Sequence, residues 1–216
     1  MKKIILILSI IFSMSSCIEI RQEITVNKDL SGSMTLVLDM GALTGNLLNA
    51  AEKFINIDFF KKIQTLPNKA VAKIQGMNGI SNIKAIDDKG KGMFGLSFDF
   101  KDSKTLNQTF YKLFNQKKTI FKPSLLKIKK NQVKLTNITP YINLYYKLNK
   151  KDITNEELFK FITYKIVIKL PETLKKVAKN KENLIKQSDD KKILTFSFPV
   201  KEIIEKSLDT DIKVKF

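Results

Sequence analysis

The stretch Ile18-Glu-Ile-Arg-Gln-Glu-Ile-Thr-Val26, followed by Met34-Thr-Leu-Val-Leu-Asp-Met40, carries the clearest fold signal in the chain. Apolar and polar residues alternate in both segments, and Gln22 is the only break in the apolar face of the first. Alternation with period two is typical of a strand buried on one side. The intervening Asn27-Lys-Asp-Leu-Ser-Gly32 is rich in turn-forming residues. The two segments therefore predict a β-hairpin.

The same pattern recurs further along the chain. Residues 83–86 and 94–100 predict a second hairpin, with the glycine-rich segment 87–92 as its turn. Apolar residues at helical spacing predict a helix before Pro67, and Ser103 is expected to cap another helix after the second hairpin. Hairpin, helix, hairpin and helix thus follow one another in the first half.

The second half is less regular. It contains a candidate hairpin turning near Lys130-Asn131, and an aromatic segment, 138–148, of ambiguous structure. Thr154 and Glu157 have the spacing of a capping box at the start of a helix. Strands are predicted over 164–170, 193–198 and 212–216, and a short helix over 200–208. We expect an α+β fold with a mainly antiparallel sheet and helices packed on one face, as a two-layer sandwich. One domain over 17–216 is expected, with a soft boundary near Lys117-Lys118.

The N-terminus reads as an export signal. Lys2 and Lys3 precede an apolar run, 4–12, that is shorter than the roughly 20 residues needed to span a bilayer. Met14-Ser-Ser-Cys17 then resembles the bacterial lipobox, which implies a signal peptide over 1–16 and lipidation of Cys17. A membrane-spanning N-terminal helix, or a plain secretory signal with a chance cysteine, is the alternative. The resemblance predicts a membrane partner through the lipid anchor and a location in the bacterial cell envelope, at the outer membrane if the source has two membranes.

Composition excludes several classes of chemistry. The chain has no histidine and a single cysteine, so the usual ligands for zinc, copper, haem and iron–sulfur sites are lacking. Ser-His and Cys-His nucleophile pairs are absent for the same reason. The pairs Asp87-Asp88 and Asp189-Asp190 lie beside lysines in predicted turns, where Asp is favoured for local hydrogen bonding. We expect no metal, no cofactor and no enzymatic activity, although an enzyme that uses only carboxylates, lysine or tyrosine stays as an alternative.

Positive charge is concentrated in the second half. Residues 17–100 contain ten basic and nine acidic side chains, whereas 101–216 contain 27 basic and 12 acidic ones. The densest stretch supplies the candidate anion-binding residues Lys127, Lys129, Lys130 and Lys134. Further lysines stand upstream at 117, 118 and 122, and downstream at 175, 176, 179, 181 and 186. A merely solvated, lysine-rich surface is the simpler interpretation. Nucleic acid is not an expected partner, because the protein is exported and Arg21 is its only arginine.

Scattered motifs resemble a known family. The lipidated cysteine, the Asp29-Leu-Ser-Gly-Ser33 turn, the Met93-Phe-Gly-Leu96 strand and the strand end Leu170-Pro171 are similar to those of the LppM-like envelope lipoproteins. This resemblance implies an α+β envelope domain and supplies no catalytic residue. We therefore expect a non-enzymatic envelope lipoprotein that binds a protein partner or an envelope component. The alternative is that the lysine-rich C-terminal half binds anionic lipid or another polyanion. Tyr141, Tyr145 and Tyr146 are candidates for an apolar groove, with core packing as the commoner role.

Overall fold

The computed structural model describes residues 18–41, 57–114, 124–149, 156–178 and 184–216. Its elements, in chain order, are β1 (Ile18–Val26), β2 (Gly32–Asp39), α3 (Ile57–Ile74), β3 (Ile80–Asp88), β4 (Met93–Phe100), α4 (Ser103–Leu113), β5 (Leu126–Lys129), β6 (Gln132–Leu135), α5 (Thr139–Asn149), η2 (Glu156–Phe161), β7 (Ile162–Lys169), β8 (Lys176–Val177), β9 (Ile185–Gln187), β10 (Ile193–Pro199), α6 (Val200–Glu205) and β11 (Ile212–Lys215). The predicted signal peptide, Cys17 and the soft boundary at 117–118 lie outside the described residues.

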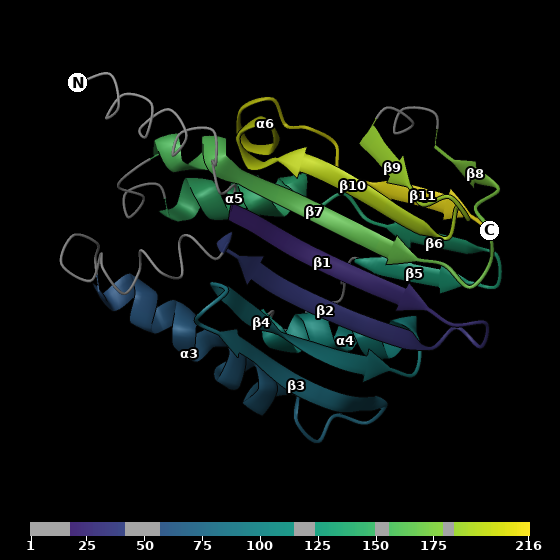
Figure 1. The fold of residues 1–216 in the computed structure, drawn as a ribbon, viewed down its shortest axis with the longest axis horizontal. Helices are drawn as coiled ribbons and strands as arrows, with labels where there is room; N and C mark the ends of the chain where they lie inside the picture. Colours follow the sequence, from purple (N-terminus) through teal and green to yellow (C-terminus); the bar gives the residue numbers. More distant parts are fainter. Residues whose placement is uncertain (1–17, 42–56, 115–123, 150–155, 179–183) are drawn as a thin grey trace, which may run out of the picture.

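Seven strands form the larger sheet, in the order β3-β4-β2-β1-β7-β10-β9 (Figure 1). The two predicted hairpins are confirmed as β1–β2 and β3–β4, and β2 pairs with β4 to join them. An all-hairpin sheet would be antiparallel throughout, but β1 and β7 pair in parallel, with Ile18 beside Ile162. The period-two patterns of both strands are correct; which strands become neighbours depends on contacts between distant parts of the chain.

Four further strands form a second sheet, in the order β5-β6-β11-β8. The predicted hairpin with its turn at Lys130-Asn131 is confirmed as β5–β6. A separate sheet was not expected, nor were the short strands β8 and β9, which lie in a segment that reads as a lysine-rich stretch. Figure 1 shows this sheet beside the end of the larger sheet at which β1 and β7 finish, whereas β1 begins at the opposite end.

One principal cluster of buried side chains unites the strands of both sheets. It draws on the inward residues of β1, β4, β7 and β10 and on those of the smaller sheet, including Ile24, Phe98, Ile166, Phe196 and Val214. All five are almost fully buried. Successive side chains of a strand point to opposite sides, so the residues between the buried ones face away from the core. Each strand of the cluster thus contributes one apolar face. The secondary structure therefore combines helices with strands, and strands predominate, as expected of an α+β fold.

Helix boundaries differ from the predicted ones at two places. The helix α3 does not end before Pro67 but continues through it to Ile74, which is fully buried. Packing of α3 against β3 and β4 outweighs the backbone hydrogen bond that proline cannot donate. The cap of α4 is Asp102 rather than Ser103: its carboxylate accepts a hydrogen bond from the backbone N–H of Thr105 at 2.7 Å. This bond lowers the pKa of Asp102.

The remaining helical segments lie in the second half of the chain. The ambiguous aromatic stretch is helical, as α5, and packs with the short helix α6. Helix α6 is shorter than predicted, ending at Glu205, and it contacts β7 and β10. Of the expected capping box, Thr154 lies outside the described residues, and the 3-10 helix η2 follows it.

Candidate functional site: a lysine face

The outer side of the four-stranded sheet carries lysines in register across its strands. Lys127 of β5 lies opposite Lys134 of β6, which lies opposite Lys213 of β11. The neighbouring row runs, strand by strand, through Lys129, Gln132, Lys215 and Lys176. We call these six lysines and Gln132 the lysine face. All six lysines are exposed and Gln132 is partly so.

Strict alternation in the sequence produces this face. In β5, β6 and β11, every second residue is buried: Leu126, Ile128, Val133, Leu135, Ile212 and Val214. Residues between them point to the other side of the sheet because successive side chains of a strand alternate. Val177 of β8 is buried in the same way, so its neighbour Lys176 completes the face. Hydrophobic burial thus fixes the direction of every lysine.

Three of the four lysines singled out from the sequence, Lys127, Lys129 and Lys134, lie on this face. The fourth, Lys130, is exposed in the β5–β6 turn beside it. Sequence reasoning missed Lys213 and Lys215, although the pattern Ile-Lys-Val-Lys-Phe at 212–216 places both on the polar side of a strand. Lysines 117, 118, 122, 179 and 181 lie outside the described residues, and Lys186 belongs to β9 of the other sheet.

The lysine face has no internal neutralisation. The four strands contain no Asp or Glu, and the nearest acidic residue along β11 is Asp211, immediately before it. Within the described ranges, no ion pair joins any of the six lysines to a carboxylate. Like charges directly opposite each other in a sheet are destabilising, by roughly 0.2–1 kcal/mol per pair. An anionic ligand would therefore relieve the repulsion between these lysines.

Buried polar contacts hold the smaller sheet in place. The side-chain amide of Asn107 in α4 donates to the carbonyl of Leu126 at 2.6 Å, and its oxygen accepts from the N–H of Leu126 at 3.0 Å. Asn107 thereby satisfies the backbone at the start of β5 as a neighbouring strand would. At the other border, the Thr139 hydroxyl donates to the carbonyl of Leu208, and Thr210 bonds Asn137 at 2.9 Å. These contacts fix β5 and the entry to β11.

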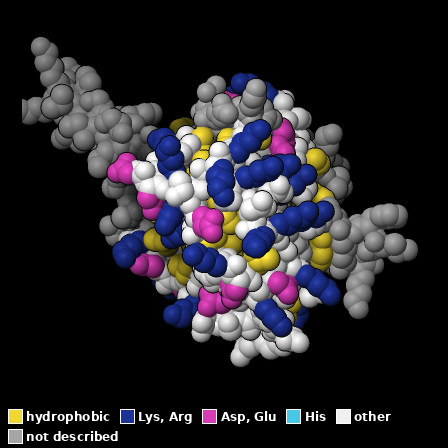
Figure 2. All heavy atoms as spheres, turned by 90° about the vertical axis from the view of Figure 1, so that its right-hand side faces the viewer, with side chains coloured by type: hydrophobic (Ala, Val, Ile, Leu, Met, Phe, Trp, Pro, Cys, Tyr) yellow, Lys and Arg dark blue, Asp and Glu magenta, His cyan; other side chains and the backbone are white. Residues whose placement is uncertain are grey.

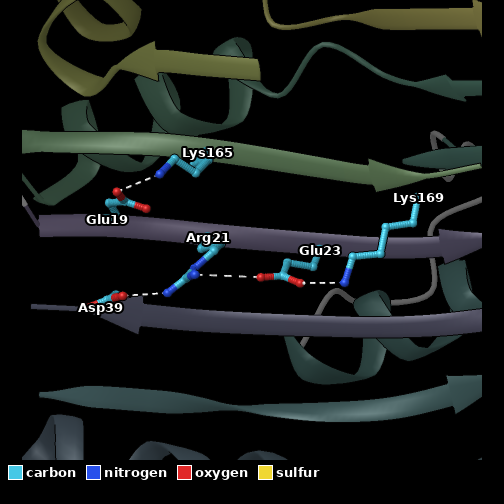
Figure 3. Close-up of polar contacts among 6 residues, drawn as sticks. All are labelled: Glu19, Arg21, Glu23, Asp39, Lys165 and Lys169. Atoms are coloured by element: carbon cyan, nitrogen blue, oxygen red, sulfur yellow. Dashed lines mark hydrogen bonds and ion pairs between the residues drawn. The ribbon is translucent and has the colours of Figure 1, made fainter. Parts of the chain in front are cut away.

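The outer face of the larger sheet is arranged differently. Figure 3 shows Arg21 between two carboxylates, with Asp39 at 2.5 Å and Glu23 at 3.7 Å. Glu23 also meets Lys169 at 3.5 Å, and Glu19 meets Lys165 at 2.7 Å. Basic and acidic side chains therefore alternate along β1 and its neighbours, and their charges offset one another. Compared with β1 and its neighbours, the outer side of the smaller sheet therefore carries charge that no carboxylate of its own strands offsets.

The other candidate residues serve local structure. Asp88 accepts from the backbone N–H of Lys91 within the β3–β4 turn. Asp190 accepts from the hydroxyl of Ser188 and the N–H of Lys192, and the first of these bonds is the main cause of its lowered pKa. Both carboxylates thus have the turn role expected of them. Tyr141 is exposed and Tyr146 meets the ring of Phe159 edge-on, whereas the Tyr145 side chain lies outside the described part.

A hollow of about 450 Å³ with a mixed polar and apolar lining lies near the β1–β2 turn. Its lining includes Asn27, Ser31, Ser81, Asp99 and Lys101, with Asp99 as the only carboxylate among the described residues that line it. Two carboxylates are needed for the acid–base pairs of carboxylate-only hydrolases, so this hollow does not supply one.

The described residues contain no group of three or more His, Cys, Asp or Glu side chains able to hold a metal ion. None of the helices in the described ranges is both long enough and apolar enough to cross a bilayer.

Comparison with known proteins yields one distant likeness. No protein-family model matches the chain, and no curated protein does so at a significant level. The folded domain of LppM from Mycobacterium tuberculosis, determined by NMR, aligns with a TM-score of 0.40 and 9% sequence identity, over 92% of this chain and 88% of that one. The LppM-like resemblance in sequence is thus accompanied by a coarse structural likeness, and nothing about function follows from it.

Proposed function

We propose that this protein is a non-enzymatic envelope lipoprotein whose lysine face binds an anionic component of the envelope. The register of Lys127, Lys134 and Lys213, on strands without a single carboxylate, is the observation that carries the proposal. Surface lysines that form no ion pair attract phosphate and carboxylate groups without demanding one geometry. Each lysine close to an anionic surface contributes about 1 kcal/mol.

The anchor is the second part of the proposal. Cys17 would carry acyl chains that hold the domain at the membrane, and β1 begins at Ile18, so no linker separates the fold from the lipid. Two or three chains on one cysteine are needed for stable attachment, because a single chain binds only marginally. Metabolic labelling with a fatty-acid analogue tests this part. The wild-type chain should take up label, and the Cys17→Ala chain should not; equal labelling of both would reject the anchor.

Binding of the full chain to an immobilised sulfated polymer tests the lysine face. The triple variant Lys127→Gln, Lys134→Gln and Lys213→Gln should elute at clearly lower salt than wild type. Screening by salt weakens such contacts strongly, so elution position is a sensitive measure.

A matched control removes the same charge elsewhere. Lys69, Lys84 and Lys89 are exposed and belong to the first half of the chain, and they have no ion pair within the described ranges. Their triple Gln variant should elute close to wild type. Equal losses in the two triple variants would mean that net charge alone governs binding, and the lysine face would then have no special role.

A further inference from the structure

We infer that the ligand of the lysine face is a single linear polymer bearing phosphate groups, and not the surface of a bilayer. This inference rests on the proposed function and specifies the class of ligand. It follows from three features of the molecule: the narrow shape of the charged area, the absence of apolar side chains on it, and its distance from the N-terminal end of β1.

The charged area is long and narrow. With strands about 4.8 Å apart, the row that crosses four strands is about 14 Å long and the row that crosses three is about 10 Å long. Two residues along a strand separate the rows by about 7 Å. The first row holds Lys127, Lys134 and Lys213, and the second holds Lys129, Lys215 and Lys176. An extended polyanion lying across the strands places its charges between the rows. A flat bilayer would meet only the tips of the same side chains.

The face also lacks the apolar side chains with which proteins insert into a bilayer. None of the exposed large hydrophobic residues in the described part of the chain belongs to β5, β6, β8 or β11. Two of them, Ile20 and Phe161, lie instead near the start of β1, with exposures of 43% and 49%. Ile162, next to Phe161, pairs with Ile18, so these apolar side chains mark the end from which the chain leads back to Cys17.

Distance separates the lysine face from that end. The nine residues of β1 span about 26 Å at about 3.3 Å per residue. Figure 1 places β5, β6 and β8 toward the far end of β1, and Figure 2 shows that end of the molecule covered by many Lys and Arg side chains and fewer acidic ones. At physiological salt the Debye length is about 8 Å. With β1 directed away from the anchoring membrane, anionic lipids there are too distant to attract the lysine face.

Lysine, rather than arginine, fits a polymer of this kind. An ammonium group is a point charge that meets phosphate from many directions, whereas guanidinium favours one planar, bidentate arrangement. The lysine face contains no arginine, because Arg21 is the only one in the chain and lies on the other sheet. We expect binding that depends on polymer length and salt and that tolerates variation in the groups linking the phosphates.

Inorganic polyphosphate of increasing chain length is the probe for this inference. The full chain, held in vesicles of phosphatidylcholine, should bind polyphosphate more tightly as the polymer lengthens. The gain should level off once the polymer spans the four strands, about 14 Å. The triple variant at 127, 134 and 213 should lose at least tenfold in affinity, and the control triple variant at 69, 84 and 89 should lose less than threefold. For single strands of nucleic acid, each lost contact lowers the salt slope by about 0.7, and a similar reduction per lysine is expected here.

Separate vesicles containing phosphatidylglycerol provide the competing arm. At salt concentrations where polyphosphate remains bound, light scattering should show no tethering of these vesicles to the protein-bearing ones. Tethering that is lost in the lysine-face variant would overturn the polymer inference and leave the proposed function standing. Affinity that does not change with polymer length would also overturn the polymer inference and leave the proposed function standing. If neither probe binds, both the inference and the proposed function are wrong.

Discussion

Lys134 of β6 lies directly opposite Lys213 of β11, and on its other side it faces Lys127 of β5. A lysine between two lysines is an unfavourable choice for stability, because like charges across strands repel. The buried partners Val133 and Val214 maintain the sheet despite this repulsion, since both are fully buried. The lysine face is thus a place where stability and ligand binding make opposite demands.

Replacement of Lys134 by Glu should change stability and ligand binding in opposite directions. An acidic residue between two lysines should raise the free energy of unfolding by up to about 1 kcal/mol at low salt. Affinity for polyanions should fall at the same time. Urea denaturation at low and high salt measures the first effect, which salt should diminish. Lys84 faces Ser97, so Lys84→Glu serves as the control and should change stability less. A destabilised Lys134→Glu chain would contradict the repulsion argument.

Asn107 should be important for keeping the smaller sheet attached. Its side chain forms two hydrogen bonds with the backbone of Leu126, and it is buried. The Asn107→Ala change leaves the buried N–H of Leu126 without a partner, while its carbonyl keeps only the Ser124 hydroxyl at 3.2 Å. The loss should cost about 1–3 kcal/mol. Chemical denaturation measures the loss, and hydrogen exchange at β5 should become faster. Asn143, whose amide meets Ser207 near the surface at 3.2 Å, offers a control of the same residue type. Equal effects of Asn107→Ala and Asn143→Ala would disprove the specific role of Asn107.

Tyr164 should make the fold sensitive to alkaline pH. Its hydroxyl donates to Gln22 at 2.5 Å in the interior, and burial raises its pKa well above the usual value of 10.0. Because the folded-state pKa exceeds the unfolded one, the contribution of Tyr164 to stability is complete below about pH 10 and declines as pH rises above it. Thermal unfolding between pH 8 and 11 should show this decline.

The Tyr164→Phe variant should be less stable at neutral pH, by about 1–3 kcal/mol, because Gln22 loses its donor. Its stability should also fall less steeply above pH 10. Adding Gln22→Leu should restore part of the loss, since both polar groups are then removed. An equally steep alkaline decline in wild type and Tyr164→Phe would assign the effect to other groups.

The pair formed by Arg21 and Asp39 should contribute modestly to stability. Both side chains are about one quarter exposed, and the pair belongs to the alternating charges of the larger sheet (Figure 3). A double-mutant cycle with Ala should give a coupling of about 1 kcal/mol at low salt, decreasing at high salt. The more exposed pair of Lys91 and Asp88, at 3.5 Å, should give a coupling close to zero. Similar couplings in both cycles would show that burial of the first pair has no effect.

Much of the local structure could be predicted because it depends on neighbouring residues. Both N-terminal hairpins and the hairpin turning at Lys130-Asn131 have alternating strands on either side of turn-forming residues, and each prediction is confirmed. Boundaries were less accurate: α3 continues through Pro67, and Asp102 rather than Ser103 caps α4. Packing against β3 and β4 lets α3 continue past Pro67. The Asp102 carboxylate, one residue before Ser103, supplies the hydrogen bond that caps α4.

The lysine face could be predicted only in part. Clustering along the chain was sufficient to single out Lys127, Lys129 and Lys134, because they lie in one hairpin. Lys213, and with it the continuous rows, depends on the pairing of β6 with β11, which brings together strands far apart in the sequence. Periodicity determines which side chains of a strand share a face, because that alternation is a property of the backbone. Pairing between distant strands is selected by burial of Val133 and Val214 in a common core, and this is a property of the whole fold.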